Sequence, residues 1–143
     1  MRRAHRHRGR VLRHHPHCVL VVEDNPDTRQ AIMLLLELEG FDVAGAGDGQ
    51  EALQCARSFP RLCLILLDVN MPRMDGVTFR REQLGDPRIR DIAVVVLSAL
   101  PRHHSMLGPL VELEMFQKPI DPERLVMLVE KYCAAHDGEI AVV

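Results

Sequence analysis

A run of four apolar residues that ends in a carboxylate, Leu64–Leu67 followed by Asp68, constrains the fold of this chain more than any other feature. A segment containing Pro and Gly, residues 69–76, follows at once. An uninterrupted apolar run closed by turn residues is typical of a β-strand that is buried on both faces, as in a parallel sheet. Asp68 is therefore expected at the end of a rigid strand, at the carboxyl edge where open α/β sheets bind their ligands.

The alternation of an apolar strand and a helix recurs along the whole chain. Strands are predicted at residues 18–22, 41–44, 62–68, 92–97 and 114–117. Helices are predicted at residues 26–39, 50–58, 77–84, 102–113 and 122–135. The short connections between them require parallel strands with right-handed crossovers and helices on both faces. The sequence therefore predicts an α/β fold built on a five-stranded parallel sheet with five helices.

The first helix has clear start and stop signals. Asn25 is a favourable N-cap, Pro26 suits the first helical position, and Gly40 ends the helix. Asp121 is expected to cap the last helix in the same way. Residues at helical spacing predict the apolar faces of three helices. These faces are Ala31, Leu34, Leu35 and Leu38 in the first helix, Ala52, Leu53 and Ala56 in the second, and Leu125, Leu128, Val129 and Tyr132 in the last.

Length, composition and charge restrict the class of protein. A chain of 143 residues with 47% hydrophobic residues fits one domain with a proper core. Residues 1–17 hold six of the 18 basic residues and no acid, so the other 126 residues carry a net charge of −8. An acidic body argues against nucleic acid as the partner of the folded part. The predicted organisation is a disordered basic arm at 1–17, one domain at 18–136 and a flexible tail at 137–143.

The basic arm has two interpretations. It is either a solvated extension or a tail that contacts nucleic acid, an anionic membrane or an acidic partner. Contact with nucleic acid would weaken steeply with salt and would disappear when the arm is removed.

Because neither a membrane span nor a secretory signal is recognisable, the sequence predicts a cytoplasmic protein. No apolar stretch approaches the roughly 18 residues that span a bilayer, and the N-terminus lacks the apolar segment of a secretory signal. The four cysteines show no C-x-x-C spacing. We therefore expect them to pack as small apolar side chains rather than to bind metal or form disulfides.

Four of the five predicted strands end in polar residues that would meet at one edge of the sheet. These residues are Glu23 and Asp24, Asp68, Ser98, and Lys118. If the first and third strands are neighbours, three carboxylates share one pocket, where their repulsion raises a pKa unless a cation lies among them. An oxygen-only site that leaves room for water and phosphate suits Mg²⁺, with Mn²⁺ as the alternative.

The same residues fit phosphoryl transfer. A carboxylate such as Asp68 is a competent nucleophile towards phosphorus and gives an acyl phosphate. Phosphoryl transfer needs mainly charge neutralisation and positioning, which the metal, the Lys118 ammonium and the Ser98 hydroxyl would supply. Taken singly, each residue could be a turn, cap or surface residue, but the agreement of four strand ends favours a common site.

Four segments of the chain resemble the receiver domain of bacterial two-component response regulators, the CheY-like domain. They are residues 21–25 (VVEDN), 66–76 (LLDVNMPRMDG), 95–99 (VVLSA) and 117–119 (QKP), in the order that the family has them. The resemblance extends from about residue 18 to 136. It implies a flavodoxin-like, doubly wound sheet with strand order 2-1-3-4-5.

The resemblance also implies a role for each site residue. Asp68 would be the phosphoacceptor, and Asp24 and Asp68 would bind Mg²⁺ directly. Glu23 would bind it through water and Asn70 through its main-chain carbonyl. Ser98 and Lys118 would hold the phosphoryl group and report it to the surface formed by the fourth helix, the fifth strand and the fifth helix. The donor would be the phosphohistidine of a histidine kinase or a histidine phosphotransfer protein.

One departure from the family pattern concerns the switch. The family usually has Tyr or Phe three residues before the lysine, where this chain has Met115. The neighbouring Phe116 would point to the opposite face, because side chains alternate along a strand. Gly108-Pro109 also interrupts the predicted fourth helix. The alternative is therefore an interaction module whose partner contact does not depend on phosphorylation.

The sequence also limits the activity that is expected. Aspartate-nucleophile phosphatases use an Asp-x-Asp pair whose second carboxylate is a general acid, and Asn70 at this position cannot serve as one. We therefore expect a phosphoacceptor with at most self-catalysed phosphorylation and dephosphorylation, not an enzyme. No output segment follows residue 136, so a stand-alone receiver that signals by protein–protein contact, without a DNA-binding domain, is predicted.

Overall fold

The computed structural model describes residues 18–59, 61–69, 76–99, 110 and 113–142. The predicted basic arm, the main-chain carbonyl of Asn70 and nearly all of the helix predicted at 102–113 lie outside these residues. The described strands form one parallel sheet in the order β2-β1-β3-β4-β5, which confirms the predicted doubly wound topology. The strands are β1 (Cys18–Val22), β2 (Asp42–Ala46), β3 (Leu62–Asp68), β4 (Ala93–Ser98) and β5 (Glu114–Gln117).

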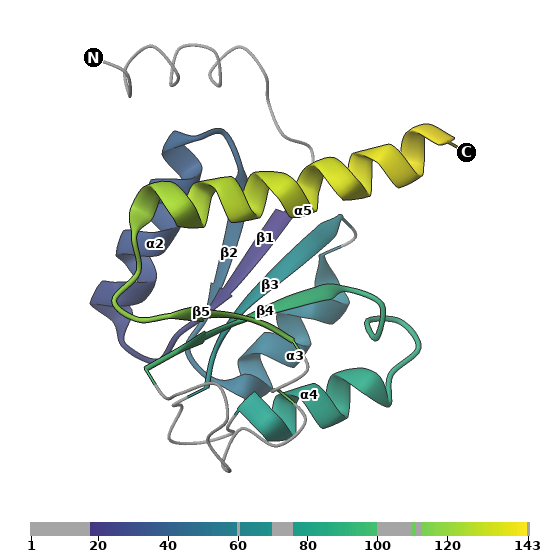
Figure 1. The fold of residues 1–143 in the computed structure, drawn as a ribbon. Coiled ribbons are helices and arrows are strands. Elements are labelled where there is room, and N and C mark those ends of the chain that lie inside the picture. Colours follow the sequence, from purple (N-terminus) through teal and green to yellow (C-terminus); the bar gives the residue numbers. More distant parts are fainter. Residues whose placement is uncertain (1–17, 60, 70–75, 100–109, 111–112, 143) are drawn as a thin grey trace.

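Helices cover both faces of the sheet (Figure 1). α2 (Pro26–Leu38) and α5 (Pro122–Val142) pack on one face, and α3 (Gly49–Ser58) and α4 (Gly76–Leu84) pack on the other. Among the described residues, no helix is both long enough and apolar enough to cross a lipid bilayer.

The last helix is longer than predicted. α5 continues to Val142, past the expected end near Ala135, so residues 137–142 are helical rather than a loose tail. The helix begins as expected, because the carbonyl of Asp121 accepts its first hydrogen bond from the Leu125 amide at 3.0 Å. No proline follows within the helix, and Ala134 and Ala135 favour its continuation.

Side chains of the central strands alternate between two apolar clusters. On β1, Leu20 and Val22 face the cluster under α3 and α4, and Val19 and Val21 face the cluster under α2 and α5. All four side chains are fully buried. Burial on both faces explains why this strand, like β3, is an uninterrupted apolar run.

The buried stripe of α2 differs from the predicted one. Ile32 and Leu36 are buried, whereas Leu34 and Leu38 are 56% and 53% exposed. Ala31 is also exposed and Leu35 is half-buried. Apolar residues occupy every position from 31 to 36, so helical spacing alone is compatible with more than one stripe. The buried faces of the other two helices are confirmed, with Tyr132 only partly buried.

β2 begins at Asp42 and ends at Ala46, slightly later than predicted. Phe41, which was included in the predicted strand, is buried instead in the cluster under α2 and α5. The Met33 and Arg29 side chains of α2 fill the space beside Gly45, since a Cβ atom there would lie 2.6 Å from the Met33 sulfur and 3.2 Å from Arg29 Cδ.

The end of α2 is a Schellman motif centred on Gly40. The Gly40 amide donates to the carbonyl of Glu37 at 3.0 Å, and the Phe41 amide donates to the carbonyl of Leu36 at 3.1 Å. Gly40 has a φ of 97°, which glycine adopts without steric cost. Leu36 and Phe41 lie in the same buried cluster, as expected from the apolar contact that frequently accompanies this motif.

Replacing Gly40 by Ala is expected to lower the free energy of unfolding by about 1–2 kcal/mol, because a Cβ atom disfavours this backbone conformation. Urea unfolding followed by far-UV circular dichroism measures the change. Gly85→Ala is the matched control, since its backbone is not left-handed and its Cβ would make only ordinary contacts. Equal destabilisation by the two substitutions would contradict this explanation of the helix end.

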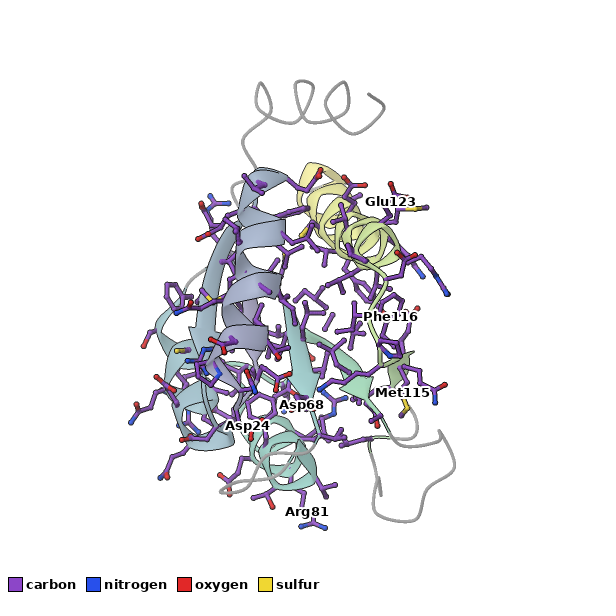
Figure 2. The ribbon with its side chains drawn as sticks, turned by 90° about the vertical axis from the view of Figure 1, so that its left-hand side faces the viewer. Asp24, Asp68, Arg81, Met115, Phe116 and Glu123 are labelled. Atoms are coloured by element: carbon purple, nitrogen blue, oxygen red, sulfur yellow. The ribbon has the colours of Figure 1, made fainter. Side chains whose placement is uncertain are left out.

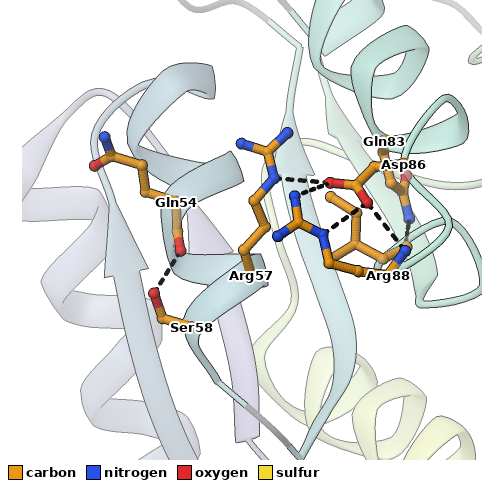
Figure 3. A network of polar contacts seen from close by, with 7 residues as sticks. Gln54, Arg57, Ser58, Gln83, Asp86 and Arg88 are labelled. Atoms are coloured by element: carbon orange, nitrogen blue, oxygen red, sulfur yellow. Dashed lines mark hydrogen bonds and ion pairs between the residues drawn. The ribbon is translucent and has the colours of Figure 1, made fainter.

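An ion-pair network connects α3 to the turn after α4 (Figure 3). Arg57 Nε donates to Asp86 Oδ2 at 2.8 Å, and Arg88 donates to both Asp86 oxygens at 3.1 and 3.0 Å. The buried Gln83 side chain donates to the carbonyls of Ile89 and Ile92, both at 3.0 Å. The network thus fixes the connection between α4 and β4. Hydrogen bonds from Arg88 and Arg57 hold the pKa of Asp86 well below its ordinary value of 3.8.

The Asp86 network is expected to make stability depend on pH. A lowered pKa means that its stabilisation is fully present well above pH 3.8 and is lost as the pH falls through the lower folded-state value. Asp86→Asn should therefore lower the melting temperature at pH 7, and the difference from the parent should shrink in acid. Thermal melts across this range measure it, with the exposed Asp91→Asn as control. A difference that is constant with pH would argue against the ion pairs as its source.

Candidate functional site

Three carboxylates gather at the carboxyl edges of β1 and β3. Glu23 and Asp24 follow β1, and Asp68 is the last residue of β3. The two strands are neighbours, with Val22 beside Leu67. One carboxylate oxygen from each acid lies within 4.8 Å of the others. Glu23 and Asp68 are buried and Asp24 is exposed, so the cluster opens to solvent on the Asp24 side (Figure 2).

The turn that carries Glu23 is held by hydrogen bonds at the start of α2. The Asn25 amide donates to Glu23 Oε2 at 3.3 Å, and the Asn25 side chain caps the helix by accepting from the Thr28 amide at 3.0 Å. Arg29 donates to the main-chain carbonyl of Glu23 at 2.8 Å. Sequence reasoning missed Arg29. Its position four residues after the N-cap, on the face that returns to the strand end, is the signal that could have indicated it.

Lys118, directly after β5, completes the cluster from the far side. Its Nζ atom donates to Asp68 Oδ1 at 3.1 Å and to Glu23 Oε1 at 3.3 Å. Its main-chain amide donates to the carbonyl of Ser98 at 2.9 Å, which continues the β4–β5 pairing. The Lys118–Pro119 peptide bond is cis. The lysine thus links residues that come from β1, β3 and β5.

The remaining residues predicted for the site and its switch lie on β4 and β5. Ser98 is the last residue of β4 and is fully buried between β3 and β5. Met115 packs towards the cluster under α3 and α4, and Phe116 packs towards the cluster under α2 and α5. The two neighbours therefore point to opposite faces, as predicted. The guanidinium of Arg124 lies 5.5 Å from the centre of the Phe116 ring.

Burial and charge shift two pKa values in the cluster. Burial raises the pKa of Glu23 to about 7, and the nearby Asp68 carboxylate adds to the rise while Lys118 opposes it. Burial alone would lower the pKa of Lys118, but the Asp68 and Glu23 carboxylates together raise it. The cluster therefore holds three carboxyl groups and one ammonium, which pairs with two of them, and a further cation would relieve the remaining repulsion.

The donor set fits a hard divalent cation. It offers carboxylate oxygens alone, and the exposed Asp24 leaves room for water to complete the coordination. Mg²⁺ prefers one or two carboxylates together with waters and phosphate oxygens, and Mn²⁺ accepts the same ligands. The carboxylates that the structure brings together are therefore suited to either ion.

Sequence comparison links this site to a family. A protein-family model, described as "Response regulator receiver domain", matches residues 19–130. An uncharacterized 14.6 kDa protein of Leptolyngbya boryana is 35% identical over 120 residues, which cover 82% of this chain and 90% of the relative. The DNA-binding response regulator MtrA of Mycolicibacterium smegmatis is 31% identical over 128 residues, 86% of this chain. The match spans only 53% of that longer relative.

Solved structures agree with the sequence comparison. The chemotaxis response regulator CheY4 of Vibrio cholerae superimposes with a TM-score of 0.72 at 29% identity, covering 81% of this chain and 98% of that one. The response regulator TrrA of Thermotoga maritima, solved in complex with Mg(2+)-BeF, has a TM-score of 0.69 at 28% identity with the same coverage. This chain belongs to the response regulator receiver family, whose members serve as phosphoacceptors in two-component signalling.

Proposed function

We propose that this chain accepts a phosphoryl group on Asp68 in a Mg²⁺-dependent reaction and signals the change through protein–protein contacts. The observation that carries the proposal is the contact of Lys118 with Asp68 inside the cluster of three carboxylates. A buried aspartate beside both a lysine and two further acids is poorly explained as a structural ion pair. It is well suited to a reaction in which negative charge arrives at the aspartate.

In the proposed reaction, the phosphoryl group moves from the donor to Asp68. An Asp68 carboxylate oxygen attacks the phosphorus of a phosphohistidine, the new oxygen–phosphorus bond forms, and the bond from phosphorus to the imidazole nitrogen breaks. Asp24 and Asp68 would hold Mg²⁺ directly, with Glu23 acting through water and Asn70 through its main-chain carbonyl. When bound, the ion would neutralise charge on the phosphoryl oxygens.

Lys118 and Ser98 have distinct roles in the proposal. Lys118 now pairs with the Asp68 carboxylate, and it would transfer this contact to a phosphoryl oxygen once Asp68 is modified. Ser98 would donate a hydrogen bond to another phosphoryl oxygen from the end of β4. Because Lys118 directly follows β5, its movement would first displace Met115, Phe116 and the start of α5.

The proposed partners follow from this chemistry. The donor would be a histidine kinase or a histidine phosphotransfer protein, and a downstream protein would contact the surface that includes β5 and α5. Self-catalysed loss of the phosphoryl group is the only turnover that we propose. A second candidate function is an interaction module that does not depend on phosphorylation. Met115, in place of the aromatic that the family usually has, favours this candidate.

Amide NMR with beryllofluoride and Mg²⁺ separates these functions, with Asp68→Asn as control. The proposal expects shifts at Asp68, Ser98 and Lys118 in the parent alone, which extend to β5 and α5. Shifts confined to the pocket would show a site that accepts phosphate without coupling to that surface. Absence of any shift in the parent would sink the proposal and favour the phosphorylation-independent module.

A further inference from the structure

Two cysteines far apart in the sequence meet in the core. Cys63 is the second residue of β3 and Cys133 lies on α5. Their sulfur atoms are 2.8 Å apart, although 70 residues separate them in the chain. Both belong to the buried cluster under α2 and α5, with exposed fractions of 6% and 1%. The pair therefore joins β3 to α5. Figure 1 shows how this helix packs across the sheet.

The other cysteines provide a contrast. Cys18 is buried in the cluster on the opposite face of the sheet, and Cys55 is half-buried on α3. The Cys18 thiol contacts its own chain neighbour, the carbonyl of Val19. Among the described contacts, only Cys63 and Cys133 bring two sulfur atoms into hydrogen-bonding distance.

The geometry brings the two thiols close to a covalent bond. A disulfide has a sulfur–sulfur distance of about 2 Å, so the atoms need to approach by less than about 1 Å. Rotation of the two side chains within a packed core can supply a movement of this size. One thiol already donates to the other, so the sulfur atoms face each other rather than separate apolar neighbours.

We propose that Cys63 and Cys133 form a reversible disulfide when the protein is exposed to hydrogen peroxide. One thiol loses its proton, its thiolate attacks a peroxide oxygen and the oxygen–oxygen bond breaks; the hydroxide that leaves takes up this proton, so a sulfenic acid and water form. The second sulfur then attacks the first, the sulfur–sulfur bond forms, and a second water leaves. Two thiols lose two electrons and two protons in total, and the peroxide is reduced to water.

The environment of the pair would make this oxidation slow. The hydrogen bond with Cys133 and burial raise the pKa of Cys63, which disfavours the thiolate that reacts with peroxide. Peroxide must also reach side chains that α5 covers. Prolonged exposure to peroxide would therefore oxidise the pair, whereas brief exposure would not. Local opening of α5 would control the rate of this oxidation.

The disulfide would restrain α5 at a position away from the carboxylate cluster. Cys63 lies near the start of β3, and Asp68 lies at its other end. The closed loop from Cys63 to Cys133 contains α4, β4 and β5, so the bond would limit movement of α5 relative to the sheet. This inference does not depend on the proposed phosphorylation.

Peroxide treatment followed by denaturation and thiol alkylation tests the proposal on the full chain. The reduced protein should take up four alkyl groups, one on each free cysteine, and the oxidised protein should take up two fewer. Peptide mapping without reductant should find one cross-link, between Cys63 and Cys133. The melting temperature should rise on oxidation and return to its starting value after dithiothreitol.

Two variants sharpen the test. The Cys18→Ala, Cys55→Ala double variant should keep the cross-link and the rise in melting temperature, and Cys133→Ala should lose both. Mapping on the parent protein needs neither variant, so the proposal can be tested even where a variant fails to fold. Sulfinic acid at these cysteines, a cross-link to Cys18 or Cys55, or unchanged alkylation after prolonged peroxide treatment would overturn the proposal.

Discussion

Replacing Asp24 by Asn is expected to weaken Mg²⁺ binding by at least roughly tenfold, the loss that even an outer-shell partner of a metal can cause. Asp24 is the exposed member of the carboxylate cluster, and the proposal makes it a direct ligand. The substitution keeps the shape of the side chain but removes one negative charge, and charge count is a main determinant of affinity for hard cations. Calorimetric titration of the metal-free protein with Mg²⁺ measures the effect.

Asp27→Asn provides the matched control for Asp24. Asp27 is an exposed acid three residues further along, in the first turn of α2, and it is not part of the cluster. It should change the affinity little, because screening by solvent weakens its field at the site. Equal effects of the two substitutions would mean that general acidity attracts the ion, and unchanged binding in the Asp24 variant would remove this residue from the ligand set.

Replacing Phe79 by Ala is expected to lower the free energy of unfolding by about 3–5 kcal/mol, the usual loss for a large buried aromatic. The Phe79 ring is fully buried, and it packs from α4 into the cluster that includes β1 and β3. Domains of this size are stable by only about 5–15 kcal/mol, so this single cavity would remove a large share. Urea unfolding followed by circular dichroism measures the change.

Phe59→Ala is the comparison for Phe79, because this ring is 40% exposed at the end of α3. The same atoms are removed, but much less buried surface is lost, and we expect a cost of about 1 kcal/mol. Similar losses for the two variants would show that the ring of Phe79 does not fill the core as its burial implies. Circular dichroism should also confirm that the Phe79→Ala variant retains its secondary structure, since a chain that no longer folds gives no unfolding transition.

The topology and most of the site could be predicted because their signals are local in the sequence. Strands buried on both faces are uninterrupted apolar runs, as in β1 and β3, and polar residues at strand ends meet when the strands are parallel. The buried stripe of α2 could not be read in this way. Leucines surround Ile32 and Leu36, and the choice among them depends on how the helix rotates against the sheet.

Sequence patterns did not predict the contacts between segments that are distant in the chain. Arg29 belongs to the site through a main-chain carbonyl, so its position four residues after the N-cap is the one sequence signal that could have indicated it. The pairing of Arg57 with Asp86 spans 29 residues, and that of Cys63 with Cys133 spans 70. Such pairs depend on the packing of whole helices, and single residues in a sequence carry little information about it.

The distribution of the cluster over three strands has a thermodynamic consequence. Lys118 is 50 residues from Asp68 and 95 residues from Glu23, so the unfolded chain holds no comparable group of charges. A cation that binds the folded arrangement and not the unfolded chain adds its binding free energy to the stability of the whole domain. Folding of the domain and binding of the cation are therefore coupled, because both depend on the intact sheet that brings these residues together.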